Sequence, residues 1–190
     1  MNRRLTPLTG AAVGALIAVS ALAGCSAHPG QAAVMTYTDA QGERQHLRLG
    51  EDRVQSIAAE LGPLGVSPGH VVQTLTDAPF VERVARDNGL EVSAEDARAE
   101  LEAVQAQNQV QDQGQAGAAQ VDVGSLSDDA VEVIRLSLLT SQINQLPQAQ
   151  ELQGEYQAWR RSSPVSYSPR YTGQARSWIL DSGVPGLPQG

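Results

Sequence analysis

The side chains that most often carry catalysis or bind metals are scattered along this chain. The three histidines, His28, His46 and His70, lie far apart, and none has a partner at the spacing of a metal-binding H-E-x-x-H helix. Carboxylates come as neighbouring pairs, such as Glu95–Asp96 and Asp128–Asp129, at expected helix starts, where negative charge stabilises the helix dipole. We therefore expect packing, capping and surface roles for these groups, with no metal site and no cofactor.

Nucleophilic side chains are equally isolated. Ser162–Ser163 has no base nearby in the sequence, and no G-x-S-x-G elbow, phosphate-binding loop or dinucleotide fingerprint occurs. The single cysteine, Cys25, excludes an internal disulfide and a multi-cysteine zinc site. The expectation is a protein without catalytic residues that is not an enzyme.

The residues before Cys25 predict an N-terminal leader. Arg3 and Arg4 precede a short apolar run that leads to Gly24. Positive charge followed by such a run is typical of a secretory signal peptide, and the run is shorter than the roughly 20 residues of a stable membrane span. We expect residues 1–24 to be the signal peptide.

The end of this leader, Leu22-Ala23-Gly24-Cys25, resembles the lipobox of bacterial lipoproteins. The resemblance implies cleavage between Gly24 and Cys25 and transfer of diacylglycerol to the Cys25 thiol. Two acyl chains on one thiol meet the requirement for lasting membrane attachment. It thus implies a chain lipid-anchored at the extracytoplasmic face of the cell membrane, with residues 25–31 as a tether. An ordinary signal peptide with an incidental cysteine is the alternative.

The composition is acidic. The chain has 21 acidic and 13 basic residues, the latter all arginine, for a net charge of −8 and a pI near 4.8. This balance argues against nucleic acid as a partner, because binding phosphates requires basic surface. Cleavage would remove Arg3 and Arg4 but no acidic residue, so we expect the mature body to stand off an anionic leaflet on its tether.

Apolar spacing predicts a mainly α domain of about four to five helices. The segment 71–104 predicts two helices joined by a tight turn at Asn88–Gly89, with Ser93 capping the second helix. The first of them is expected to start at Ser67–Pro68, and Pro79 is expected to kink or split it. Later helices are expected from Leu126 to Pro147 and then to Arg160–Arg161, whose charges would favour the helix end.

Two β-prone stretches complete the predicted domain. Residues 32–38 and 43–49 flank the turn residues Asp39–Gly42 and predict a hairpin. A late extended stretch, 164–168, is expected to pair with this hairpin, which gives a small antiparallel β-element made from both ends of the domain.

The predicted domain is interrupted once. Residues 110–124, rich in Gln and Gly, predict a flexible linker because they carry too few apolar side chains to repay the entropy of ordering. The linker separates the hairpin and first helices, 32–109, from the late helices and strand, 125–171. Residues 172–190 are expected to be a loose tail.

The order of these features resembles the N-terminal chaperone domain of the SurA/PrsA family of extracytoplasmic foldases, especially short lipoproteins of high-GC Gram-positive bacteria. The matching parts are the strand after the tether (32–38), the turn region from Ala85 to Asp96, and Val165–Tyr171, where the family tends to have an Asn-Pro-Arg-Tyr-like sequence. Two departures are Tyr167–Ser168 in place of the expected Asn, and a longer hairpin.

Full-length members of that family carry a parvulin isomerase domain between the first helices and the last. Here that interval holds only the linker, so the resemblance implies a peptide-binding chaperone module without isomerase activity. Its clients would be unfolded secreted polypeptides, bound in a cleft between helices. The candidate wall residues are apolar or aromatic, with core packing as the alternative for the aromatics: Phe80, Val84, Ile134, Leu138, Tyr156 and Trp159.

The second hypothesis is a structural or interaction lipoprotein that binds one specific envelope partner. The two hypotheses share the lipid anchor and differ in whether the partner is unfolded or folded.

Overall fold

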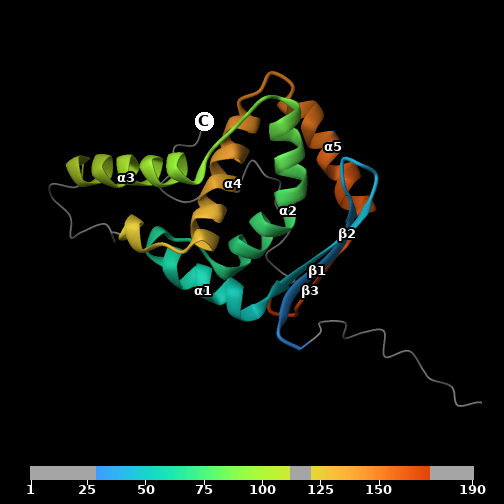
Figure 1. The fold of residues 1–190 in the computed structure, drawn as a ribbon, viewed down its shortest axis with the longest axis horizontal. Coiled ribbons are helices and arrows are strands. Elements are labelled where there is room, and N and C mark those ends of the chain that lie inside the picture. Colours follow the sequence, from blue (N-terminus) through green and yellow to red (C-terminus); the bar gives the residue numbers. More distant parts are fainter. Residues whose placement is uncertain (1–28, 112–120, 172–190) are drawn as a thin grey trace, which may run out of the picture.

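The computed structural model describes residues 29–111 and 121–171. Within them the chain forms five α-helices and a three-stranded antiparallel sheet at one side of the helices (Figure 1). This confirms the predicted mainly α fold with a small antiparallel β-element. The predicted signal peptide, Gly24, Cys25, most of the predicted linker and the predicted tail lie outside the described residues.

The sheet has the order β2-β1-β3. β1 (Gln31–Thr38) and β2 (Arg44–Gly50) form the predicted hairpin, and β3 (Val165–Tyr167) pairs with β1. Because side chains alternate across a strand, one face buries residues such as Met35 and Leu49 against the helices. The other face carries partly or fully exposed side chains.

α1 (Glu51–Leu61) follows β2 directly and ends where Gly62 and Pro63 form a 3-10 turn, η1 (Gly62–Leu64). The end of the described chain is fastened to this helix. The buried Tyr171 hydroxyl donates to Glu51 at 2.8 Å, and Arg170 forms an ion pair with the same carboxylate at 2.6 Å. The two ends of the domain therefore meet at the start of α1.

α2 (Pro68–Asp87) begins as expected, with the Ser67 hydroxyl accepting from the His70 backbone N–H at 3.2 Å. It is continuous through Pro79, so the possibility that proline splits it is wrong. Proline removes one helix hydrogen bond, but here Thr76 before it and Phe80 after it are both buried, so both halves are held in the core.

The turn after α2 follows the predicted chemistry. Gly89 has a φ of 67°, and the Leu90 N–H donates back to the Ala85 carbonyl at 2.8 Å. α3 (Ala94–Gln111) then begins with a reciprocal cap, in which Ser93 and Asp96 bond each other's backbone N–H at 3.0 and 2.9 Å.

α2 and α3 nevertheless do not pack side by side. Both contact α4 (Asp128–Asn144), and α3 extends away from the rest of the molecule (Figure 1). The predicted helical hairpin is therefore two helices that share one partner, because the apolar stripe of α4 faces both.

The structure describes residues at both ends of the predicted linker. α3 runs on to Gln111, and a second 3-10 turn, η2 (Val123–Ser125), buries Val123. The Gln105 amide accepts from the Val121 N–H at 2.9 Å and donates to the Val121 carbonyl at 3.3 Å. The expectation of a flexible linker up to Gly124 is wrong at this end, since these contacts order residues 121–124 against α3.

α5 (Ala149–Ser162) follows the break at Pro147 and lies against the upper half of α2 (Figure 1). Its buried side chains Leu152 and Tyr156 belong to the same core as α2 and α4. One hydrophobic core thus joins all the helices to the inner face of the sheet.

Candidate functional site

Four of the six predicted wall residues lie inside the core. Phe80, Val84, Ile134 and Tyr156 are all buried, and the Phe80 and Tyr156 rings meet edge to face with centroids 5.3 Å apart. In this structure a peptide cannot reach them. Large apolar side chains at helical spacing here serve the packing of α2, α4 and α5.

The other two predicted residues are partly exposed and lie apart. Trp159 packs on Phe80 with centroids 5.5 Å apart, and it lines a small hollow of about 110 Å³ beside the β1–β2 turn. Leu138 of α4 lines a different, larger hollow of about 340 Å³. The predicted single wall is therefore not formed.

The open apolar surface is a groove that we call the α4 groove. It consists of two hollows, of about 460 and 340 Å³, that share Glu91 and Val92 of the α2–α3 turn. Ala85, Leu90 and Leu139 contribute the apolar lining of the first hollow, and Leu138 contributes that of the second. The groove thus runs along α4, between it and the residues that connect α2 to α3.

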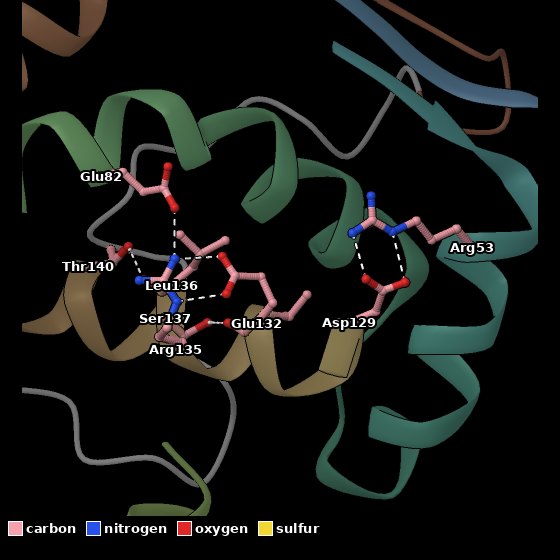
Figure 2. Close-up of polar contacts among 9 residues, drawn as sticks. Arg53, Glu82, Asp129, Glu132, Arg135, Leu136, Ser137 and Thr140 are labelled. Atoms are coloured by element: carbon pink, nitrogen blue, oxygen red, sulfur yellow. Dashed lines mark hydrogen bonds and ion pairs between the residues drawn. The ribbon is translucent and has the colours of Figure 1, made fainter. Parts of the chain in front are cut away.

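The two hollows differ in charge. In the first, Arg135 donates two bonds of 2.7 Å to Glu132 and one of 2.8 Å to Glu82 (Figure 2). The bonds to Glu132 are the largest cause of a raised Arg135 pKa, and the bond to Glu82 adds to it. Arg135 therefore stays charged, and the two carboxylates balance its charge. The second hollow carries carboxylates and, among its described lining residues, no arginine: Glu91, Asp96 and Glu100.

The most strongly perturbed acid of the described chain lies outside this groove. Asp77 of α2 has a side chain 4% exposed, which forms an ion pair with Arg160 of α5 at 3.3 Å and accepts from the Tyr156 hydroxyl at 2.9 Å. Burial raises the pKa of Asp77 to about 6, although Arg160 and Tyr156 both act to lower it. At neutral pH the pair is therefore largely ionised inside the protein.

Arg160 extends this network to the sheet. Its guanidinium donates to the Tyr167 hydroxyl at 2.8 Å and lies 3.8 Å from the Met35 sulfur. Arg160 lies in the last turn of α5, as predicted, but its side chain is only 17% exposed and is directed into this network. A single acid within the apolar run Leu75-Thr-Asp77-Ala-Pro-Phe80 was the signal that could have indicated a buried partner.

Histidines and acids of the described residues form no metal site. No group of three or more potential ligands comes together in the described ranges. His46 bonds Thr36 at 3.0 Å on the outer face of the sheet, while burial lowers the pKa of His70. His28 lies outside the described residues. No helix in the described ranges has the length and apolar character needed to cross a membrane.

No protein-family model, curated protein or solved structure matches this chain. The resemblance to SurA/PrsA chaperone domains and to the lipobox of lipoproteins therefore stays a prediction from the sequence. The geometry of the α4 groove and the buried Asp77–Arg160 pair are the observations on which a function can be argued.

Proposed function

We propose that this protein is a membrane-anchored, extracytoplasmic holdase that binds unfolded segments of secreted polypeptides without isomerase activity. Its anchor would be the lipidated Cys25, following the lipobox-like sequence. The observation that carries the proposal is the α4 groove, which offers apolar side chains along α4 and the α2–α3 turn. No catalytic step, metal or cofactor is required.

The size and lining of the groove suit a short extended segment. The two hollows together match the volume range of small-ligand pockets, and their shared residue Val92 would separate two adjacent client side chains. Leu90 and Leu138 are partly exposed at its two halves. A bound client would cover these two side chains and remove their apolar surface from water, which is the main driving force for such binding.

The charge of the groove adds a preference among clients. Glu91, Asp96 and Glu100 form no ion pair within the described residues and line the second hollow. Complementary charge raises encounter rates and disfavours like-charged partners. The proposed clients are therefore apolar segments flanked by lysine or arginine.

A closed core favours a second candidate, an interaction lipoprotein with one folded partner. Because Phe80, Val84 and Ile134 are buried, the apolar surface offered at the groove is small. A small pre-formed groove suits one complementary partner at least as well as many clients. A crosslinking pull-down separates the two: many unfolded clients indicate the holdase, and one stoichiometric partner indicates the second candidate.

The holdase proposal is tested by aggregation of unfolded clients, followed by light scattering with the protein in excess. The wild type should slow aggregation, and Leu90→Ser with Leu138→Ser should lose most of that effect. Leu64→Ser is the matched control, because Leu64 is also partly buried against the core but lies at η1, outside the groove. Failure of the wild type to slow several clients, or full activity of the groove variant, would overturn the proposal.

A further inference from the structure

The outer face of the sheet is basic, in contrast to the acidic chain. The β1–β2 register places Arg48 beside Val34, His46 beside Thr36, and Arg44 beside Thr38, all on the same face. Arg44, His46 and Arg48 are exposed. We call these three side chains the basic sheet face.

The arginines of this face differ from most others in the described chain. Six arginines, those at positions 53, 83, 98, 135, 160 and 170, form ion pairs with carboxylates. Arg44 and Arg48 form no ion pair within the described residues, so their charge is directed to solvent. On a chain with a net charge of −8, two arginines without ion pairs on one face of a strand, with His46 between them, give that face a local positive charge.

The position of the face in the chain indicates what lies opposite it. β1 begins at Gln31, and the segment 26–30 that separates it from Cys25 spans at most about 20 Å when fully extended. A lipid on Cys25 would therefore hold the sheet near the membrane, where anionic headgroups act over about a Debye length of 8 Å. Of all the described parts, the hairpin is the first that such an anchor would bring to the surface.

We propose that the basic sheet face docks on anionic lipid headgroups and orients the anchored protein. The proposal rests on the lipid anchor of the proposed function. Each arginine near an anionic surface favours contact roughly fivefold, so two give about a 25-fold preference. That is too little to recruit a free protein, but it is enough to orient one that is already tethered.

This orientation changes the expectation that an acidic body stands off the membrane. The Asp39 carboxylate stays charged, but it lies toward the other face of the hairpin, where it accepts from the Gln45 amide at 2.7 Å. Gln45 alternates with Arg44 and His46 along β2 and so points away from the basic sheet face. The sheet and α3 lie at opposite sides of the molecule (Figure 1). Docking the sheet would therefore direct α3 away from the membrane.

The test uses the full lipoprotein, purified from membranes and reconstituted into phosphatidylcholine vesicles with or without phosphatidylglycerol. Thr38→Cys provides a site for a fluorescent label on the basic sheet face. Cys25 is the single natural cysteine, and its thiol is blocked once it is acylated, so the introduced cysteine is the one that reacts with the label. A nitroxide on the lipid headgroup quenches labels that approach the surface. Quenching should be at least threefold stronger with phosphatidylglycerol and should fall at high salt.

Two charge-matched variants make the test specific. Arg44→Gln with Arg48→Gln should abolish the phosphatidylglycerol effect, whereas Arg53→Gln with Arg161→Gln removes two other exposed arginines, on α1 and α5, and should preserve it. Equal quenching in both vesicles, or equal loss in both variants, would overturn the docking while the lipid anchor stands. Competition by polyglutamate without any lipid dependence would indicate an acidic protein partner and also overturn it. If mass spectrometry finds Cys25 without a lipid, both the proposed anchor and this inference are overturned.

Discussion

At the scale of single residues, the Asp77–Arg160 pair is the strongest constraint in the described chain. Taking both charges out of water is costly, and their mutual contact at 3.3 Å with the Tyr156 hydroxyl offsets that cost. The pair joins α2 to α5, and the Arg160–Tyr167 bond adds β3. We interpret it as a structural fastening between the two halves of the chain and not as a catalytic acid.

Removing one member of the pair should therefore be much worse than removing an exposed neighbour. Arg160→Met leaves Asp77 buried without its cation and should lower the free energy of unfolding at pH 7 by about 3–5 kcal/mol. Arg161→Met, next to it but exposed, should change it by less than about 0.5 kcal/mol. Urea denaturation measures both, and similar effects for the two variants would refute the assigned role of Arg160.

The raised pKa of Asp77 also predicts a pH dependence. The folded protein holds this proton more tightly than the unfolded chain, so its contribution to stability is complete below a pH of about 4 and is lost as the pH rises through about 6. Asp77→Asn cannot titrate. Relative to wild type, this variant should therefore gain about 3 kcal/mol in unfolding free energy between pH 4 and pH 7, on top of a constant offset. A difference that does not vary with pH would contradict the raised pKa.

At the scale of elements, local signals predicted the helix ends correctly. Ser67 and Ser93 cap α2 and α3, Gly89 takes the left-handed turn, and Pro147 separates α4 from α5. Each of these depends on neighbours within a few residues, which a sequence displays directly. The fixed position of Val121 could not be predicted in this way, because it depends on a bond to the Gln105 amide, which lies 16 residues earlier in the chain.

Gly89 gives the clearest test at this scale. A Cβ at this position would meet no atom within 4 Å, but the φ of 67° strains any other residue, so Gly89→Ala should cost about 1 kcal/mol. Gly154 lies inside α5 with the same open surroundings, so Gly154→Ala should instead stabilise by about 0.5–1 kcal/mol. Thermal unfolding of both variants checks the opposite signs, and a shared sign would rule out the left-handed turn as the cause.

At the scale of the whole molecule, the sequence predicts the fold class better than the surface. Apolar periodicity places Phe80 and Val84 on the stripe of one helix and Ile134 on that of another, but it cannot tell whether a stripe is packed or open. The structure packs them and leaves the opening at the α2–α3 turn instead, because α2 and α3 both use α4 as their partner. The Asp77–Arg160 ion pair could not be predicted either, because the two residues lie far apart in the sequence and meet only when α2 and α5 pack together.

The arrangement of the whole molecule separates two surfaces with opposite charge. The basic sheet face lies at the side where the chain leaves the proposed anchor, and the α4 groove adds unpaired carboxylates at the α2–α3 turn. A tethered protein with this arrangement would hold its groove toward newly secreted chains while its sheet meets the membrane. Tyr171, bonded to Glu51, keeps the last described residues fastened to α1 beside that sheet.

The central claim is that the α4 groove receives unfolded polypeptide. The most direct measurement places a photo-crosslinking amino acid at Leu138 of the full lipoprotein, with Leu64 as the control position, and identifies what each captures in the presence of unfolded secreted proteins. We predict that position 138 captures many clients through apolar segments flanked by lysine or arginine, and that position 64 captures few. Equal capture at both positions, or a single folded partner at position 138, would contradict the account.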